Sequence, residues 1–229
     1  MDKLSAGLYI VPTPIGNMGD VSPRVRDTLA SADIVACEDT RRTGMLLKNL
    51  DIKANRLMSY HEHNEKSRAE SLAEEIAKGR SVALASDAGM PGISDPGYRI
   101  IQSCIERDLP ITPLPGPTAF VPALVASGLP FDKFTFMGFP PQKKGRKTFL
   151  ESATANSYTT IFYESPYRVV DLFERISQID PDRNSCAARE ISKIHEEFIR
   201  GTAEYIYKEL SARDSIKGEF VIIIDGKKD

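Results

Sequence analysis

Short apolar segments alternate with longer amphipathic segments through the first half of the chain. The apolar segments predict buried strands at residues 8–11, 34–37, 56–60, 82–85 and 111–114. Apolar residues at helical spacing predict helices near residues 22–31, 45–50, 66–79 and 98–105. Strands that alternate with helices are typical of the α/β class, in which parallel strands are joined by helical crossovers.

The second half of the chain repeats this rhythm after a break rich in proline and glycine. Strands are expected at residues 134–139, 159–163, 185–188, 196–201 and 220–224, and helices at 119–127, from 165 onward and at 202–210. The break begins with Pro115-Gly116-Pro117, which a strand or helix does not continue through. The sequence therefore predicts two α/β lobes, residues 1–117 and 118–229.

Ser-Pro pairs predict the starts of two helices. A serine hydroxyl caps the first turn, and proline suits the first helical position because its missing N–H would have no partner there. Ser22-Pro23 predicts one start and Ser165-Pro166 the other.

Composition narrows the class of protein. The 229 residues are 41% hydrophobic and 27% charged, which is ordinary for a soluble globular protein. The formal net charge of −2 means that nucleic-acid binding requires a local basic patch. Three widely spaced cysteines favour reduced thiols over disulfides or a zinc site. No segment resembles a secretion signal or a membrane span, so a cytoplasmic protein is expected.

The loop at residues 86–97 is the first candidate for chemistry. It follows a predicted buried strand, precedes a predicted helix and contains three glycines that let a ligand approach the backbone. It carries Asp87 and Asp95 but no basic residue before Arg99, and it matches no phosphate-binding pattern. This composition favours a ligand with hydroxyls, an amine or positive charge. The alternative is a structural turn whose aspartates cap the next helix.

Other polar and aromatic groups each have two interpretations. Lys143, Lys144, Arg146 and Lys147 form either a phosphate-contacting loop or a solvated one. Alternating phenylalanines at 134, 136 and 139 predict packing on a sheet face rather than base stacking. His61 and His63 have the spacing of a strand pair, but no other ligand cluster supports a metal site, and none is expected.

Seven segments, taken in order, form a recognisable set. They are Val11–Asn17, Glu38–Thr43, Ser59–Asn64, Ser86–Gly97, Pro113–Pro117, Phe162–Pro166 and Lys217–Val221. The set spans nearly the whole chain and closely resembles the ribosomal RNA 2′-O-methyltransferases of the tetrapyrrole methylase superfamily. The resemblance implies two α/β lobes with S-adenosylmethionine (SAM) in the cleft between them. It also implies a homodimer that methylates a cytidine ribose in the decoding region of 16S rRNA, within the small ribosomal subunit.

The resemblance gives the loop at residues 86–97 a ligand. SAM carries a sulfonium, an ammonium and ribose hydroxyls, which suit a loop with two carboxylates. By similarity, Asp87 and Met90 contact SAM, and Gly89 and Gly92 give access to the backbone. The same similarity places Ile15, Thr118 and Ala119 in this pocket. It places Gly218 on the side that closes over the adenine of SAM.

A ribose hydroxyl is a weak nucleophile, so a general base or strong acceptor is expected to assist its methylation. The candidates at predicted strand ends are Glu38, Asp39, His61, His63, Glu164 and Glu190. Asp39, together with Arg41, is favoured as catalytic, although Asp39 could instead cap the following helix. Three functions stay open: an rRNA methyltransferase, a small-molecule tetrapyrrole methylase, and a non-catalytic RNA- or ribosome-binding protein.

Overall fold

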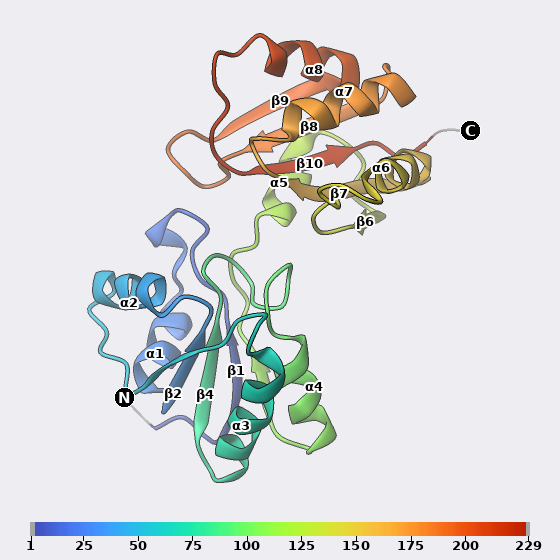
Figure 1. The fold of residues 1–229 in the computed structure, drawn as a ribbon. Helices are drawn as coiled ribbons and strands as arrows, with labels where there is room; N and C mark the ends of the chain where they lie inside the picture. Colours follow the sequence, from blue (N-terminus) through green and yellow to red (C-terminus); the bar gives the residue numbers. More distant parts are fainter. Residues whose placement is uncertain (1–2, 228–229) are drawn as a thin grey trace. The chain divides into compact units, whose positions relative to one another are not determined.

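The computed structural model describes residues 3–227. The chain divides into two compact units, Met1–Thr118 and Ala119–Asp229, and each contains its own five-stranded sheet (Figure 1). Both units combine strands with helices, so the predicted α/β class is confirmed.

The first unit has a fully parallel sheet in the order β3-β2-β4-β1-β5. Its strands are β1 (Gly7–Val11), β2 (Ile34–Cys37), β3 (Leu57–Ser59), β4 (Ser81–Ala85) and β5 (Ile111–Pro113). Its helices are α1 (Pro23–Ser31), α2 (Thr40–Asn49), α3 (Glu65–Ala77) and α4 (Tyr98–Glu106), with a 3-10 turn, η1 (Met18–Asp20). The helices cover both faces of the sheet, which explains the unbroken apolar runs of β2 and β4 (Figure 1).

The second unit has a mixed sheet in the order β6-β7-β10-β8-β9, in which only β6 and β7 are parallel. Its strands are β6 (Phe134–Phe136), β7 (Thr159–Glu164), β8 (Asn184–Arg189), β9 (Glu197–Thr202) and β10 (Phe220–Ile224). Its helices are α5 (Phe120–Ser127), α6 (Arg146–Ala155), α7 (Val169–Ile179) and α8 (Ala203–Ser211). Helices α6, α7 and α8 share one apolar core with the sheet. On α5, Phe120 stacks on Phe136, so packing of that aromatic residue against a neighbouring element is confirmed.

Several predicted boundaries were wrong, among them the end of the strand expected at residues 134–139, which is Phe136. Helix α2 begins at Thr40, five residues before the expected start, because the Asp39 carboxylate accepts the Arg41 N–H and caps it there. Helix α6 begins at Arg146, so the basic segment is only partly a loop. Helix α7 begins at Val169 rather than after Ser165. The Ser165 carbonyl instead closes a turn, because it accepts the Arg168 N–H at 3.0 Å.

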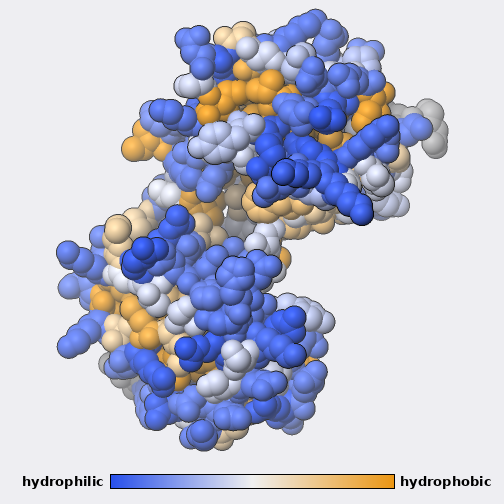
Figure 2. Space-filling view, viewed as in Figure 1, coloured by the Kyte–Doolittle hydropathy of each residue, from blue (hydrophilic) through white to orange (hydrophobic). Residues whose placement is uncertain are grey.

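The cysteines and the surface match what composition predicted. All three cysteines are free and buried. Hydrophilic residues cover much of the face seen in Figure 2, with small hydrophobic areas between them. None of the helices within residues 3–227 is long and apolar enough to cross a membrane.

Candidate active site

Four strands of the first sheet end at the same level. In the pairing register, Ala85 of β4 lies beside both Val11 of β1 and Cys37 of β2, and Cys37 lies beside Ser59 of β3. The segments that follow these strands therefore meet at one edge of the sheet. In doubly wound proteins this carboxyl edge is where ligands bind.

The loop at residues 86–97 is fixed to this edge where it starts. Thr13 and Gly89 exchange two backbone hydrogen bonds, with N···O distances of 2.9 and 3.0 Å. The Ser86 hydroxyl donates to the Gly89 carbonyl at 2.7 Å, and the Thr13 hydroxyl donates to the Ser86 carbonyl at 3.1 Å. All three residues are buried, so the start of the loop has a defined position.

The end of the loop is fixed by a residue that the sequence did not single out. The Glu65 carboxylate accepts the N–H groups of Gly97 and Arg99, at 3.1 and 3.3 Å, at the first turn of α4. The Tyr60 hydroxyl donates to the same carboxylate oxygen at 3.1 Å. Because Glu65 supplies these acceptors and α4 has no side-chain cap of its own, the interpretation of Asp95 as a helix cap is wrong.

Glycines in this loop adopt conformations that other residues rarely reach. Gly89 and Gly92 both have φ near +85°. A Cβ on Gly89 would lie 3.4 Å from Cγ2 of Ile15, so these two predicted cofactor residues lie together. Gly92 is exposed with open space beside it, and Met90 packs partly buried against the core under α3 and α4.

The remaining predicted cofactor residues lie around the division of the chain or beyond it. Thr118 ends the first unit and Ala119 begins the second. Gly218 lies in the second unit with φ of +92°, where a Cβ would come within 2.5 Å of the Glu190 side chain. Their assignment to the cofactor stays a prediction.

Three carboxylates gather at the carboxyl edge of the first sheet. Asp87 accepts the Asp39 N–H at 3.1 Å and pairs with Arg42 at 3.3 Å. Burial raises the pKa of Glu38, and the Asp87 charge adds to this effect. Burial, with Glu38 and Asp87 nearby, also raises the pKa of Asp95 to about 7. This group of like charges is electrostatically suited to a positively charged ligand.

Some of these residues line an open pocket of about 560 Å³. Its lining consists of Glu38, Asp39, Thr40, Arg41, Arg42, Ser59, His61 and Asp87. The pocket thus combines residues that follow β2, β3 and β4, as expected from the aligned strand ends. All three segments are among the seven recognised in the sequence, but the sequence did not predict that Glu38 and Asp95 belong to one charged group.

The favoured catalytic pair makes a close contact. Arg41 donates from Nη2 to Asp39 Oδ2 at 2.7 Å and from Nε to Oδ1 at 3.1 Å. With the helix-capping bond from its N–H, Arg41 holds the pKa of Asp39 well below its usual range. The capping role is therefore present. A catalytic role of the pair stays a prediction.

The two histidines of the third segment do not form a ligand set. Their rings meet edge to face with centroids 5.9 Å apart, and Nε2 of His61 lies 3.2 Å from the Asn64 amide nitrogen. Within residues 3–227, the structure contains no group of three or more histidine, cysteine or acidic side chains able to hold a metal ion.

The four basic residues of the predicted RNA-contacting loop differ in environment. Lys143, Lys144 and Lys147 are exposed. Arg146 is only 6% exposed, and its Nη2 lies 2.8 Å from the buried Glu164 carboxylate. The prediction of Arg146 as an exposed phosphate contact is therefore wrong, because this carboxylate and Asp171 hold it inside the second unit.

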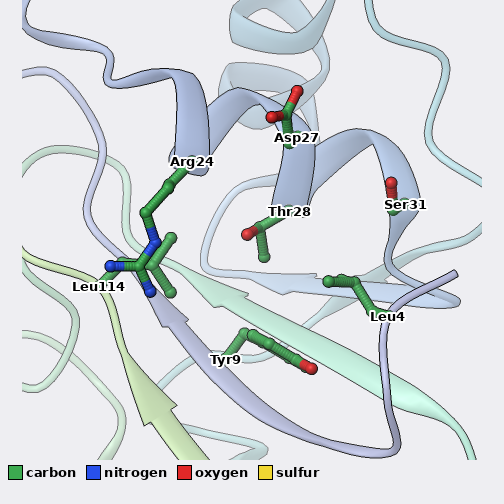
Figure 3. Close-up of a pocket in the computed structure, with 7 residues that line it drawn as sticks. All are labelled: Leu4, Tyr9, Arg24, Asp27, Thr28, Ser31 and Leu114. Carbon is green, nitrogen blue, oxygen red and sulfur yellow. The ribbon is translucent and has the colours of Figure 1, made fainter. Parts of the chain in front are cut away.

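A second pocket, of about 360 Å³, lies between α1 and the first sheet (Figure 3). It is lined by Leu4, Tyr9, Arg24, Asp27, Thr28, Ser31 and Leu114. In Figure 3 the Arg24 side chain reaches from α1 toward Leu114. Of the seven recognised segments only the fifth, through Leu114, contributes to it, so the carboxyl edge remains the better candidate site.

Comparison with known proteins identifies the family. The model of the tetrapyrrole (corrin/porphyrin) methylases matches residues 7–207. A protein of Hydrogenobaculum sp. named ribosomal RNA small subunit methyltransferase I is 45% identical over 217 residues, which is 95% of this chain and 94% of that protein. The chain belongs to this methyltransferase I branch of the tetrapyrrole methylases. It is thus an enzyme that uses SAM as its methyl donor.

Other relatives of the methylase carry the same name. The protein of Halalkalibacterium halodurans is 47% identical, over 96% of this chain and 75% of its own length. That of Escherichia coli O157:H7 is 42% identical, over 99% and 80%. Among solved structures, the methyltransferase CobJ has a TM-score of 0.69 at 20% identity and covers 97% of this methylase and 95% of its own chain. That similarity is one of fold.

The carboxyl edge of the first unit of the methylase fits the chemistry of SAM. The carboxylates of Glu38, Asp87 and Asp95 suit a ligand with two positive groups. Burial and the neighbouring carboxylates raise the pKa of Glu38 and Asp95, so a bound cation would stabilise their ionised forms. The open space at Gly92 allows a ligand to approach the backbone. Residues of this edge would therefore hold the methyl donor.

Proposed function

We propose that this methylase transfers the methyl group of SAM to a ribose 2′-hydroxyl of a cytidine in the decoding region of 16S rRNA. The small ribosomal subunit is the substrate, and the enzyme acts in the cytoplasm as a homodimer. The observation that carries the proposal is 45% identity, across 95% of the chain, to a protein named for small subunit rRNA methylation. Exposed Lys143, Lys144 and Lys147 support a polyanionic substrate.

Positioning is the main contribution of the first unit. When bound, SAM supplies a methyl group on a positively charged sulfur, which is already a good leaving group. Asp87 and Asp95 would hold the positive end of the donor, while Ile15, Gly89 and Met90 define its contact surface. Alignment of the reacting atoms can supply a large part of the rate enhancement.

Removal of the hydroxyl proton requires an acceptor whose pKa lies near the working pH. Asp39 is poorly suited, since Arg41 keeps its carboxylate ionised and hydrogen-bonded. The pair is better suited to orienting the ribose through its exposed guanidinium. Asp95 has a pKa of about 7, but a bound cation would lower that pKa, so its proposed role is to hold the donor.

The proposed function is tested by methyl transfer to isolated subunits. Purified protein is incubated with SAM labelled in its methyl group and with small subunits from cells that lack this modification. We expect label in 16S rRNA at one cytidine ribose, mapped by nuclease digestion and mass spectrometry. Free rRNA and a tetrapyrrole precursor are the parallel substrates. Label on the tetrapyrrole and none on RNA would overturn the proposal, and label on neither would support a non-catalytic role.

Binding of SAM is expected to depend on the protonation of Asp95. A cation favours the ionised carboxylate, so affinity should rise as pH rises through about 7, where Asp95 loses its proton. Between pH 8 and pH 6, the affinity attributable to this group should fall about five- to tenfold. Calorimetry across this range measures the effect. Because SAM itself titrates, the comparison is with Asp95→Asn, and identical profiles for both proteins would exclude the role of Asp95.

The raised pKa of Asp95 affects the stability of the fold in the opposite direction: affinity for SAM should rise with pH, whereas stability should fall. A carboxyl whose pKa is raised in the folded state binds protons more tightly there than in the unfolded chain. The stabilisation from this proton is complete below pH 4 and is lost as pH rises through about 7. The Asp95→Asn variant should consequently melt several degrees above the wild type at pH 8 and close to it at pH 4.

A further inference from the structure

Two segments leave the second sheet side by side. β6 runs parallel to β7, and the chain after β6 continues this pairing: Met137 N–H donates to the Ile161 carbonyl, and Tyr163 N–H donates to the Gly138 carbonyl, both at 2.8 Å. The segment that carries the lysines, residues 139–145, and the turn after β7, residues 165–168, therefore begin at the same edge of this sheet.

Arg146 connects the two segments. Its N–H donates to the Lys143 carbonyl at 3.2 Å, which closes the lysine-bearing turn. Its guanidinium lies 2.8 Å from the Glu164 carboxylate and donates from Nη2 to the Arg168 carbonyl at 3.4 Å. Since the Arg146 side chain is buried, both turns are held against one fixed group.

The turn at residues 165–168 is itself well ordered by contacts. Glu164 accepts the Ser165 N–H at 2.7 Å and the Arg168 Nε–H at 3.0 Å. The Ser165 hydroxyl accepts the Tyr167 N–H at 3.2 Å. These bonds present Tyr167 at the tip of the turn, where it is 92% exposed.

The charges around this tyrosine favour a polyanion. Lys143 and Lys144 are exposed, and neither forms an ion pair with another described residue. The carboxylates of the same area are already engaged: Glu164 with Arg146 and Arg168, and Asp171 with Arg146 and Arg175. An exposed aromatic ring on a turn that Arg146 joins to a segment with two exposed lysines is a combination suited to binding unstacked nucleotides.

We infer that Tyr167, Lys143 and Lys144 form one RNA-contacting surface, in which the Tyr167 ring stacks on an unpaired base and the lysines contact neighbouring phosphates. The inference rests on the proposed function and assigns part of its substrate recognition to the second unit. Arg146 and Glu164 are positioning residues, since they act on the surface through the two turns.

The test compares methyl transfer to small subunits by the wild type, Tyr167→Ala and Tyr167→Phe. We expect Tyr167→Ala to raise KM for subunits about tenfold, because loss of one stacked base has an effect of this size. Phenylalanine keeps the ring, so Tyr167→Phe should retain the wild-type KM. The affinity for SAM should not change in either variant. Replacement of both lysines by alanine should reduce the slope of log affinity for subunits against log salt by about 1.4.

Matched controls are available at the opposite edge of the same sheet. Tyr158 precedes β7, is 47% exposed and lies beside Lys133, so Tyr158→Ala and Lys133→Ala change the same residue types elsewhere. Unchanged KM in Tyr167→Ala, or equal effects in Tyr158→Ala, would overturn the inference while leaving the proposed function intact.

Dissociation of a dimer by Tyr167→Ala in sedimentation equilibrium would instead assign the tyrosine to a contact between copies. If the wild type methylates no subunit, the proposed function itself fails, and fluorescence anisotropy with a labelled single-stranded RNA then decides whether the surface binds RNA.

Discussion

Glu164→Ala is expected to lower the free energy of unfolding by about 3–5 kcal/mol, the usual effect of removing one partner from a buried ion pair. The Glu164 side chain is fully buried, and the variant would leave the Arg146 guanidinium without this carboxylate. Arg146 already has one nitrogen, Nη1, that is buried without a hydrogen-bond partner among the described residues. The Ser165 N–H would also lose its acceptor.

Urea denaturation followed by circular dichroism measures this change. Replacing both members, Arg146→Met with Glu164→Leu, removes the charges together and should recover much of the lost stability. Lys147→Ala with Glu151→Ala serves as the exposed counterpart, since that ion pair spans 3.8 Å on the surface of α6 and should contribute little. If Glu164→Ala lowers the free energy of unfolding by less than about 1 kcal/mol, water must reach the Arg146 guanidinium and replace the carboxylate. That result would contradict the burial of the pair.

Asp87→Ala is expected to weaken SAM binding by about 10- to 100-fold, which corresponds to the loss of a hydrogen bond to a charged group. Asp87 lies at the centre of the acidic group and raises the pKa of both Glu38 and Asp95. Loss of the Asp87 carboxylate removes a negative charge that attracts the donor. The Asp39 N–H then loses its acceptor, and Arg42 loses its ion pair. Arg42 would then add an unpaired positive charge to the pocket.

Isothermal titration calorimetry with SAM measures the affinity, and melting temperature confirms that the variant is folded. Asp27→Ala is the matched control, because Asp27 is an exposed aspartate of the same unit that lines the other pocket. SAM affinity in Asp87→Ala equal to that of the wild type would remove Asp87 from the donor site.

Local patterns were sufficient to predict most elements of this fold. The runs at 34–37 and 220–224 match β2 and β10 residue for residue, since a strand covered on both faces needs continuous apolar side chains. Ser22 caps α1 as expected, because the capping interaction spans only three residues. Ser165 failed as a helix start because Glu164, its neighbour, holds the following residues in a turn.

The parts of the site that could not be predicted depend on distant partners. Arg146 looked like one member of a basic run, but its carboxylates lie 18 and 25 positions further along the chain. Asp95 had the sequence position of a helix cap, while the actual acceptor, Glu65, comes from another helix, 32 residues before the Gly97 N–H that it accepts. Neither relation leaves a pattern at helical or strand spacing, so only the tertiary structure reveals it.

The attachment of the donor loop also bears on how this enzyme could be altered. The two bonds between Thr13 and Gly89 join backbone atoms, so side-chain replacements nearby leave them available. Replacement of the side chains of Asp87 and Asp95 therefore leaves these two bonds in place, although Asp87 also accepts the Asp39 N–H. A library confined to these two positions would be a practical starting point for accepting SAM analogues with different charge or bulk.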